Sequence, residues 1–216
     1  MKTALVIGAT GLVGSQLVNL LLTDERFDKI KIFTRRSTGI AHPKLEEYII
    51  DFDQPAQWQH LLTGDILFST LGTTLKKAGS KSEQYKIDYT YQYTTAQAAA
   101  ANGVADYVLV SSAGASVNSK IFYSRMKGEL ERDIAKLPFK HIHIIQPGIL
   151  TGPRKENRTG EKIGIALASV LAHIPGLTAY KPISAGTVAQ AMINASFDDS
   201  QPLQVYPLQK VFDLAG

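Results

Sequence analysis

A short apolar run that leads into regularly spaced glycines constrains this chain more than any other feature. Residues 5–7 are apolar, Gly8, Gly11 and Gly14 follow, and apolar residues at helical spacing resume at Leu12. A continuous apolar run bounded by glycine is typical of a strand buried on both faces of a parallel sheet. The feature therefore predicts a strand, a tight glycine turn and a helix that packs back onto the strand.

Each glycine of this turn has its own physical reason. Gly8 permits the sharp turn, Gly11 lets the backbone approach an anion, and Gly14 lets helix and strand pack closely. The helix N-terminus adds free N–H groups and the positive end of its dipole. The turn therefore predicts a site for the diphosphate of a dinucleotide, with a purely structural turn as the alternative. The residues assigned to this site are Gly8, Thr10, Gly11, Leu12, Val13 and Gly14.

Strand and helix then alternate along the chain. Strands are predicted over residues 30–33, 48–50, 66–69, 107–110 and 142–145, and helices over 12–23, 82–101 and 123–136. Strands that alternate with helices build parallel sheets through right-handed crossovers. The prediction is a single α/β domain over residues 1–216, with a doubly wound parallel sheet of the Rossmann type.

Beyond Gly148 the alternation loosens. A polar loop is predicted over residues 151–161, an apolar helix over 163–172 and another helix over 187–195. This tail is too short for a core of its own. Residues 149–216 are therefore predicted to form a small region that covers the substrate side of the sheet.

Composition and charge exclude several classes of protein. Lys and Arg number 23 against 19 Asp and Glu, a net charge of +4 that is scattered along the chain, so a nucleic-acid surface is not expected. No cysteine is present, which excludes disulfides and fits a reducing cytoplasm. No segment reaches the roughly 18 apolar residues of a membrane-spanning helix. A cytoplasmic protein without membrane contact is expected, and a protein partner or a homodimer stays open.

Two arginines, Arg35 and Arg36, follow the second predicted strand. An NAD-specific site normally places an acidic residue there, about twenty residues past the glycine turn. Arg instead offers planar, paired donors to phosphate oxygens. The pair therefore predicts the 2′-phosphate of NADP(H), with a solvated basic loop as the alternative. Asp51, after the third strand, is predicted to accept from the adenine amine or else to cap a helix over residues 53–60.

The fifth strand is followed by Ser111 and Ser112, and the next helix carries Tyr123 and Lys127 on one face. A phenol with a pKa of about 10 is a poor acid–base group at neutral pH, and a neighbouring ammonium is expected to lower that pKa. Ser112 would hold a substrate oxygen and Tyr123 would pass a proton while a nicotinamide exchanges hydride. Turn-forming serines and an exposed helix face are the alternatives.

Two further turns complete the predicted cofactor site. Leu71, Gly72 and Thr73 follow the fourth strand, where bare backbone can lie against a ribose. Pro147 and Gly148 follow the sixth strand, where a rigid turn can present backbone donors to a carboxamide. Ordinary strand-ending turns are the alternative in both places.

Two other residue pairs are weaker candidates for a functional site. Tyr206 and Lys210 repeat the Tyr-x-x-x-Lys spacing, but no serine pair precedes them. His141 and His143 share a strand face, but no third ligand has a suitable spacing, so no metal site is predicted.

Together these motifs resemble those of the atypical short-chain dehydrogenase/reductases, in particular the Tat-interacting-protein-like oxidoreductases. The resemblance covers residues 8–14, 35–36, 71–74, 77–79, 87–89, 111–115, 123, 127–129 and 146–148. It implies NADP(H) on Gly8, Gly11, Gly14 and Arg35, and an active site of Ser112, Tyr123 and Lys127. Residues 71–73 depart from the Asn-Ala-Gly turn of the larger short-chain enzymes, so the resemblance names no group beyond Lys127 for a proton relay.

The leading prediction is an NADP(H)-dependent oxidoreductase that reduces a small carbonyl or oxidises an alcohol. One alternative is a non-catalytic NADPH-binding redox sensor or regulatory interaction protein, which would need the glycine turn but not Tyr123. Another is a nucleotide-sugar epimerase or dehydratase, in which the same residues serve transient hydride transfer. The tail after Gly148 is short for a second nucleotide.

Overall fold

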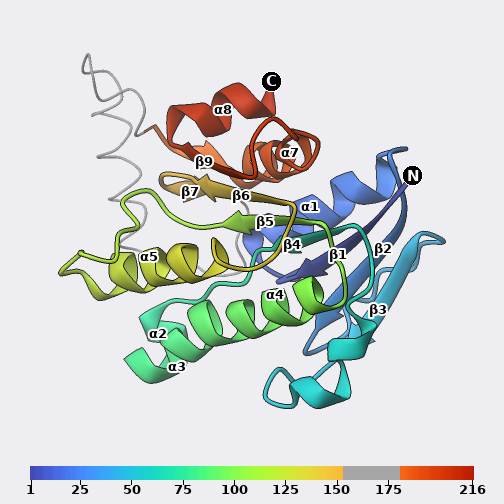
Figure 1. Cartoon of the computed structure of the whole chain (residues 1–216), viewed down its shortest axis with the longest axis horizontal. Coiled ribbons are helices and arrows are strands. Elements are labelled where there is room, and N and C mark those ends of the chain that lie inside the picture. Colours follow the sequence, from blue (N-terminus) through green and yellow to red (C-terminus); the bar gives the residue numbers. More distant parts are fainter. Residues whose placement is uncertain (153–180) are drawn as a thin grey trace.

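The computed structural model of the chain describes residues 1–152 and 181–216. Within them, seven parallel strands form one sheet in the order β3-β2-β1-β4-β5-β6-β9 (Figure 1). The order reverses between β1 and β4, which is where open α/β sheets bind ligands. The strands are β1 (Lys2–Ile7), β2 (Phe27–Thr34), β3 (Leu45–Ile49), β4 (Ile66–Ser69), β5 (Asp106–Val110), β6 (His141–Gln146) and β9 (Leu203–Pro207).

Alternate residues of the central strands face two separate hydrophobic layers. In β1, Ala4 and Val6 belong to one buried cluster and Leu5 and Ile7 to the other. Burial on both faces is why this strand is a continuous apolar run in the sequence. Helices α1 (Leu12–Thr23), α7 (Ala185–Ala195) and α8 (Gln209–Ala215) cover one face, and α4 (Tyr91–Ala101) and α5 (Phe122–Ile134) cover the other (Figure 1). The predicted doubly wound α/β fold is confirmed.

The helical segment predicted over residues 82–101 is interrupted. It consists of α3 (Lys81–Tyr85), a π-helical turn η3 (Lys86–Thr90) and α4, and it is preceded by the short helix α2 (Leu75–Ala78). The helix ends as predicted, because Gly103 adopts a φ of 83° just beyond it. A π-turn holds one more residue than an α-turn and is frequent at functional sites.

The prediction of a helix over residues 53–60 is wrong. The chain instead makes two 3₁₀ turns, η1 (Pro55–Gln57) and η2 (Gln59–Leu61). The buried Trp58 lies between them, and its indole N–H donates to the carbonyl of Asp51 at 2.7 Å. Burying this side chain holds the segment in tight turns instead of a continuous helix.

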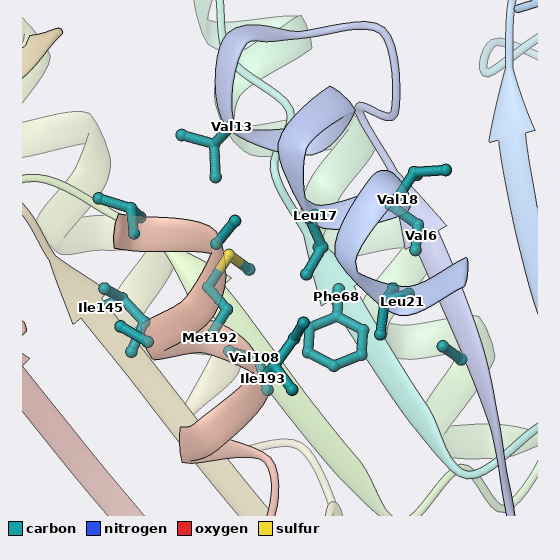
Figure 2. Close-up of a cluster of buried hydrophobic side chains, with 14 of the residues drawn as sticks. Val6, Val13, Leu17, Val18, Leu21, Phe68, Val108, Ile145, Met192 and Ile193 are labelled. Atoms are coloured by element: carbon teal, nitrogen blue, oxygen red, sulfur yellow. The ribbon is translucent and has the colours of Figure 1, made fainter. Parts of the chain in front are cut away.

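The C-terminal residues form part of the main sheet and of its core. Helix α7 packs beside α1 on the same face of the sheet, over β5 and β6, where Met192 meets Val108 and Ile145 (Figure 2), and β9 pairs with β6 as the last strand. The predicted substrate-side cover therefore does not describe α7, β9 and α8. A separate strand pair, β7 (Leu150–Thr151) with β8 (Ile183–Ser184), lies outside the main sheet. The helix predicted over residues 163–172 lies outside the described residues.

Because Met192 is fully buried against the sheet, Met192→Ala should lower the free energy of unfolding by about 2–5 kcal/mol. A lid helix that only covers a cleft would not show so large a loss. Gln190→Ala on the same helix is the control, since it removes only one helix-surface contact, to Asn194. Urea denaturation followed by circular dichroism measures both, and equal midpoints would contradict this placement of α7.

Candidate active site

The glycine turn packs against the backbone that follows β4. Gly8 adopts a φ of 82°, and a Cβ there would lie 2.5 Å from the carbonyl carbon of Thr70. A Cβ on Gly14 would overlap the carbonyl oxygen of Gly8. The N–H of Gly11 donates to that same oxygen at 2.8 Å. Side chains at Gly8 and Gly14 are therefore excluded by backbone, as the turn and packing roles predicted for them require.

The first turn of α1 offers an anion cradle. Its N-cap, Gly11, has extended backbone, and no side chain among the described residues caps the helix. A Cβ on Gly11 would meet only Gly8 O within 3.5 Å, so the space beyond this residue is open. The free N–H groups of this turn and the positive end of the helix dipole attract an anion. The donor set fits a diphosphate.

A pocket of about 380 Å³ extends from this cradle along the end of β2. It is lined by Gly8, Thr10, Arg35, Arg36 and Phe52, among others. Both arginines are exposed, and neither guanidinium forms a salt bridge within residues 1–152 and 181–216. Phe52 is a lining residue that the sequence patterns did not single out, because a buried phenylalanine after a strand is indistinguishable from core.

Asp51 is engaged in a turn. Its carboxylate accepts the N–H of Asp53 at 2.9 Å and the side-chain amide of Gln54 at 3.0 Å. This geometry favours a local structural role over the adenine contact. The carboxylate closes the turn over residues 51–54, which precedes η1, and does not cap a helix.

The predicted serine, tyrosine and lysine meet at the carboxyl end of β5. The Lys127 side chain is 2% exposed and donates to the carbonyl of Val110 at 3.2 Å. Tyr123, one turn earlier on α5, is 38% exposed. The Ser112 hydroxyl donates to the carbonyl of Ala113 at 3.4 Å and lies near enough to the Tyr123 phenol to favour its ionised form. Because parallel strands end at one edge of a sheet, this group lies at the same edge as the glycine turn.

The ionisation of Tyr123 differs from the prediction. Desolvation and the negative charge of Asp88 raise its pKa to about 12, although the Ser112 hydroxyl opposes the rise. The prediction that Lys127 lowers this pKa is therefore wrong for these residues. Burial also lowers the pKa of Lys127, against the charges of Asp88 and Glu131.

Two carboxyl groups that act on Lys127, those of the buried Asp88 and the partly buried Glu131, were not predicted as site residues. Asp88, 1% exposed in the π-turn, accepts the N–H of Thr73 at 3.0 Å. Burial raises the pKa of Asp88 to about 6, and the charge of Lys127 opposes the rise. Burial likewise raises the pKa of Glu131, one helical turn beyond Lys127. Asp88 stands in the motif at residues 87–89, to which the resemblance assigned no role, and Glu131 stands in no motif of the sequence.

Glu131 joins the ends of two strands. It accepts hydrogen bonds from the Ser111 hydroxyl after β5 and from the Gln146 amide at the end of β6, the latter at 2.9 Å. The hydroxyl of Ser111 is thus occupied, whereas the hydroxyl of Ser112 donates to the Ala113 carbonyl at 3.4 Å. Pro147 accepts the N–H of Ala113 at 3.0 Å, so the predicted turn at Pro147 and Gly148 is fastened to the end of β5.

The loop after β4 lies beside Asp88. The Thr73 N–H is taken by Asp88, and Gly72 lies so close that a Cβ there would be 3.3 Å from the Asp88 carboxylate. Leu71 also lines the pocket of the glycine turn. The predicted residues 71–73 therefore lie between the glycine cradle and Lys127.

The weaker candidates have other partners. Tyr206 lies on β9 and donates to Asp198 at 2.9 Å, while Lys210 lies on α8, so the two share no helix face. His141 bonds Asp106 at 2.8 Å, and burial lowers the pKa of His143 to about 4. In the described part of the chain, no three His, Cys, Asp or Glu side chains gather as they would around a metal ion.

No helix among the described residues has the length and apolar character needed to cross a bilayer.

Comparison with known families gives one extended match. A sequence profile of the family described as NAD(P)H-binding matches residues 8–198. The protein FMP52, mitochondrial, of Candida albicans is 36% identical over 200 residues, which are 88% of this chain and 85% of that protein. The protein of the same name from Coccidioides immitis is 35% identical and aligns over 100% of this chain and 94% of its own length.

Solved structures share the fold at low identity. A UDP-glucose 4-epimerase from Thermotoga maritima, with UDP-glucose bound, has a TM-score of 0.69 at 15% identity, covering 94% of this chain and 76% of that one. The Bordetella bronchiseptica enzyme WbmH in complex with NAD⁺ has a TM-score of 0.70 at 19% identity, covering 96% and 75%. These likenesses concern the fold alone.

The expectation of a cytoplasmic protein is contradicted. The FMP52 relatives from Candida albicans, Coccidioides immitis and Saccharomyces cerevisiae are all named as mitochondrial. The expectation came from the lack of cysteine, which excludes disulfides but does not distinguish one compartment from another.

Because a Cβ at Gly14 would overlap the Gly8 carbonyl oxygen, Gly14→Ala should lower the free energy of unfolding by about 2–3 kcal/mol. Gly186→Ala in α7 is the matched control, since a Cβ there meets nothing closer than 3.8 Å. That control should be neutral or gain up to about 1 kcal/mol from helix propensity. Urea denaturation compares the two, and a neutral Gly14→Ala would refute the packing role.

Proposed function

The chain belongs to the NAD(P)H-binding family and is a relative of the FMP52 proteins, and from this premise we propose that it is an NADP(H)-dependent oxidoreductase that reduces small carbonyl compounds. The observation that carries the proposal is the meeting of Ser112, Tyr123 and the buried Lys127 at the end of β5, where Lys127 donates to the Val110 carbonyl and Ser112 acts on the Tyr123 phenol. These groups stand at the edge of the sheet that also holds the glycine cradle.

The choice of NADP(H) over NAD(H) rests on Arg35 and Arg36. They border the pocket that leads from the cradle, at the position where NAD-specific sites place an acid. Their guanidinium groups form no salt bridge with other described residues, so their donors are available to a 2′-phosphate. The diphosphate would lie on Gly8, Thr10, Gly11, Leu12, Val13 and Gly14, and Leu71, Gly72, Thr73, Pro147 and Gly148 would border the ribose and nicotinamide.

When bound, the nicotinamide supplies or accepts a hydride. Ser112 would hold the carbonyl oxygen of the substrate by a hydrogen bond, and Tyr123 would donate a proton to that oxygen. With a pKa of about 12, the Tyr123 phenol is protonated at neutral pH. Reduction is the direction that needs a proton donor, which is why we favour it over alcohol oxidation.

We place the chain with the Tat-interacting-protein-like members of the atypical short-chain dehydrogenase/reductases on the motifs quoted above. A non-catalytic NADPH sensor would use the cradle without needing Tyr123. An epimerase would recycle its cofactor in place and would leave purification with NAD(H) tightly bound. Both alternatives differ from the proposal in measurable ways.

Tyr123→Phe should lower the rate of NADPH-dependent reduction by about 10²–10⁴-fold across a panel of aldehydes and ketones, because the proton donor is removed. Stabilisation of the protein by NADPH in a thermal-shift assay should remain. Tyr93→Phe is the control, since Tyr93 is a half-buried tyrosine of α4 that stacks on Tyr89. Turnover that survives in Tyr123→Phe would argue against the proposed chemistry.

Arg35→Ala should weaken NADPH binding about tenfold or more and leave NADH binding unchanged, because a charge-assisted contact to phosphate contributes roughly 1.5–3 kcal/mol. The measurement is a calorimetric titration with each cofactor. Arg26→Ala, an arginine whose guanidinium instead bonds Asp24 ahead of β2, is the control. An unaltered preference for NADPH in Arg35→Ala and Arg36→Ala would exclude phosphate selection by this pair.

A further inference from the structure

The loop that carries Arg35 and Arg36 is fastened to the sheet at two points. It leaves the end of β2, and both arginines line the pocket that extends from the glycine turn. At its start, the Thr34 hydroxyl donates to the Arg36 carbonyl at 2.7 Å. Further along, the loop is bound to the neighbouring strand β3 through the side chain of Glu47. The backbone on both sides of the two guanidinium groups is therefore held by bonds within the protein.

Glu47 accepts three hydrogen bonds from this loop. The donors are the Ser37 hydroxyl at 2.5 Å, the Thr38 N–H at 2.7 Å and the Thr38 hydroxyl at 2.6 Å. Desolvation acts to raise the pKa of Glu47, but the hydrogen bonds from Ser37 and Thr38 outweigh it and hold the pKa below its ordinary value. Glu47 is therefore a carboxylate at neutral pH, and it fastens the residues that directly follow the arginine pair.

A negative charge on β3 does not by itself favour a phosphate beside it, since like charges repel. Any benefit to phosphate binding has to come from the geometry that the carboxylate imposes on the loop. A backbone that is already fixed loses less conformational entropy when a ligand binds. The anchored loop keeps the two guanidinium groups beside the pocket, whereas a free loop would have to be ordered by the ligand.

We propose that Glu47 is a positioning residue for cofactor selection: by fastening the loop at Ser37 and Thr38, it holds the arginine pair where the 2′-phosphate of NADP(H) would bind. The inference rests on the proposed function and extends it from the arginines to the group that orders their loop. It requires an effect on NADPH that NADH does not share, because NADH has no phosphate at this position. A role confined to the stability of the strand edge would affect both cofactors alike.

Glu47→Ala should weaken NADPH binding about tenfold and leave NADH binding unchanged in calorimetric titrations. A tenfold change corresponds to about 1.4 kcal/mol, roughly the free energy of ordering the backbone of one residue. Glu47→Gln keeps an oxygen that can accept the Thr38 N–H and removes the charge, so it should bind NADPH at least as tightly as the wild type. An equal loss in both variants, or tighter NADPH binding in both, would overturn the proposal.

Glu46→Ala is the matched control. Glu46 is the adjacent residue of β3, and it bonds Lys29 at 2.7 Å and Tyr48 at 3.0 Å. Its replacement removes one negative charge from the same strand without freeing the arginine loop, so both cofactor affinities should equal those of the wild type. Thermal midpoints report that the variants are folded. A selective loss of NADPH binding in Glu46→Ala as large as that in Glu47→Ala would contradict the assignment.

Replacing the arginines tests whether Glu47 acts through them. In a protein that carries both Arg35→Ala and Arg36→Ala, adding Glu47→Ala should cause no further loss of NADPH binding, because residues that act through one contact are not additive. A further tenfold loss in that background would mean that Glu47 acts by another route, and the proposal would fail.

Amide hydrogen exchange gives a measurement on the protein alone. The Thr38 N–H should exchange about tenfold or more faster in Glu47→Ala and close to the wild-type rate in Glu47→Gln. Unchanged exchange in Glu47→Ala would refute the fastening. Failure of NADPH to bind the wild-type chain would count against the proposed function itself, whereas selective NADPH binding that is insensitive to Glu47→Ala would overturn this inference alone.

Discussion

The close approach of two backbones at the carboxyl end of β1 is the constraint on which the rest of the molecule depends. Thr70 donates its N–H to the Ile7 carbonyl at 3.0 Å and its hydroxyl to the same oxygen at 2.8 Å. The space beside Thr70 then admits no side chain at Gly8 or Gly14. This contact directs the first turn of α1 to the switch point between β1 and β4, and so sets where an anion can bind.

Much of the fold could be predicted because the central strands are buried on both sides. Such strands are short apolar runs, and β4 matches its predicted bounds, residues 66–69. The edge strand β9 was missed, since its apolar residues Leu203 and Val205 are exposed and Gln204 between them is polar. The π-turn and the 3₁₀ turns were also missed, because they depend on tertiary contacts: Tyr85 and Tyr89 bond to α5, and Trp58 is buried in the core.

The site was predictable to the extent that its residues stand next to strand ends or share a helix face. Ser112, Tyr123 and Lys127 meet as expected. Glu131 could not be found in this way, because its partners are set by the packing of α5 against the ends of β5 and β6. Asp88 stood in the motif at residues 87–89, but its place beside the loop after β4 is visible only in the structure. The sequence led to a predicted fall in the pKa of Tyr123, whereas the structure raises it. The prediction failed because only the structure places the charge of Asp88 near the phenol.

The pairing of β7 with β8 has a consequence for how much the sequence can vary in length. Leu150 pairs with Ile183 and Thr151 with Ser184, so two segments that are far apart in the sequence lie side by side. Because these two short strands are adjacent, the number of residues between them in the sequence does not set the register of any of the seven main strands. The same sheet can therefore be completed by β9 in relatives whose sequences differ in length at this point.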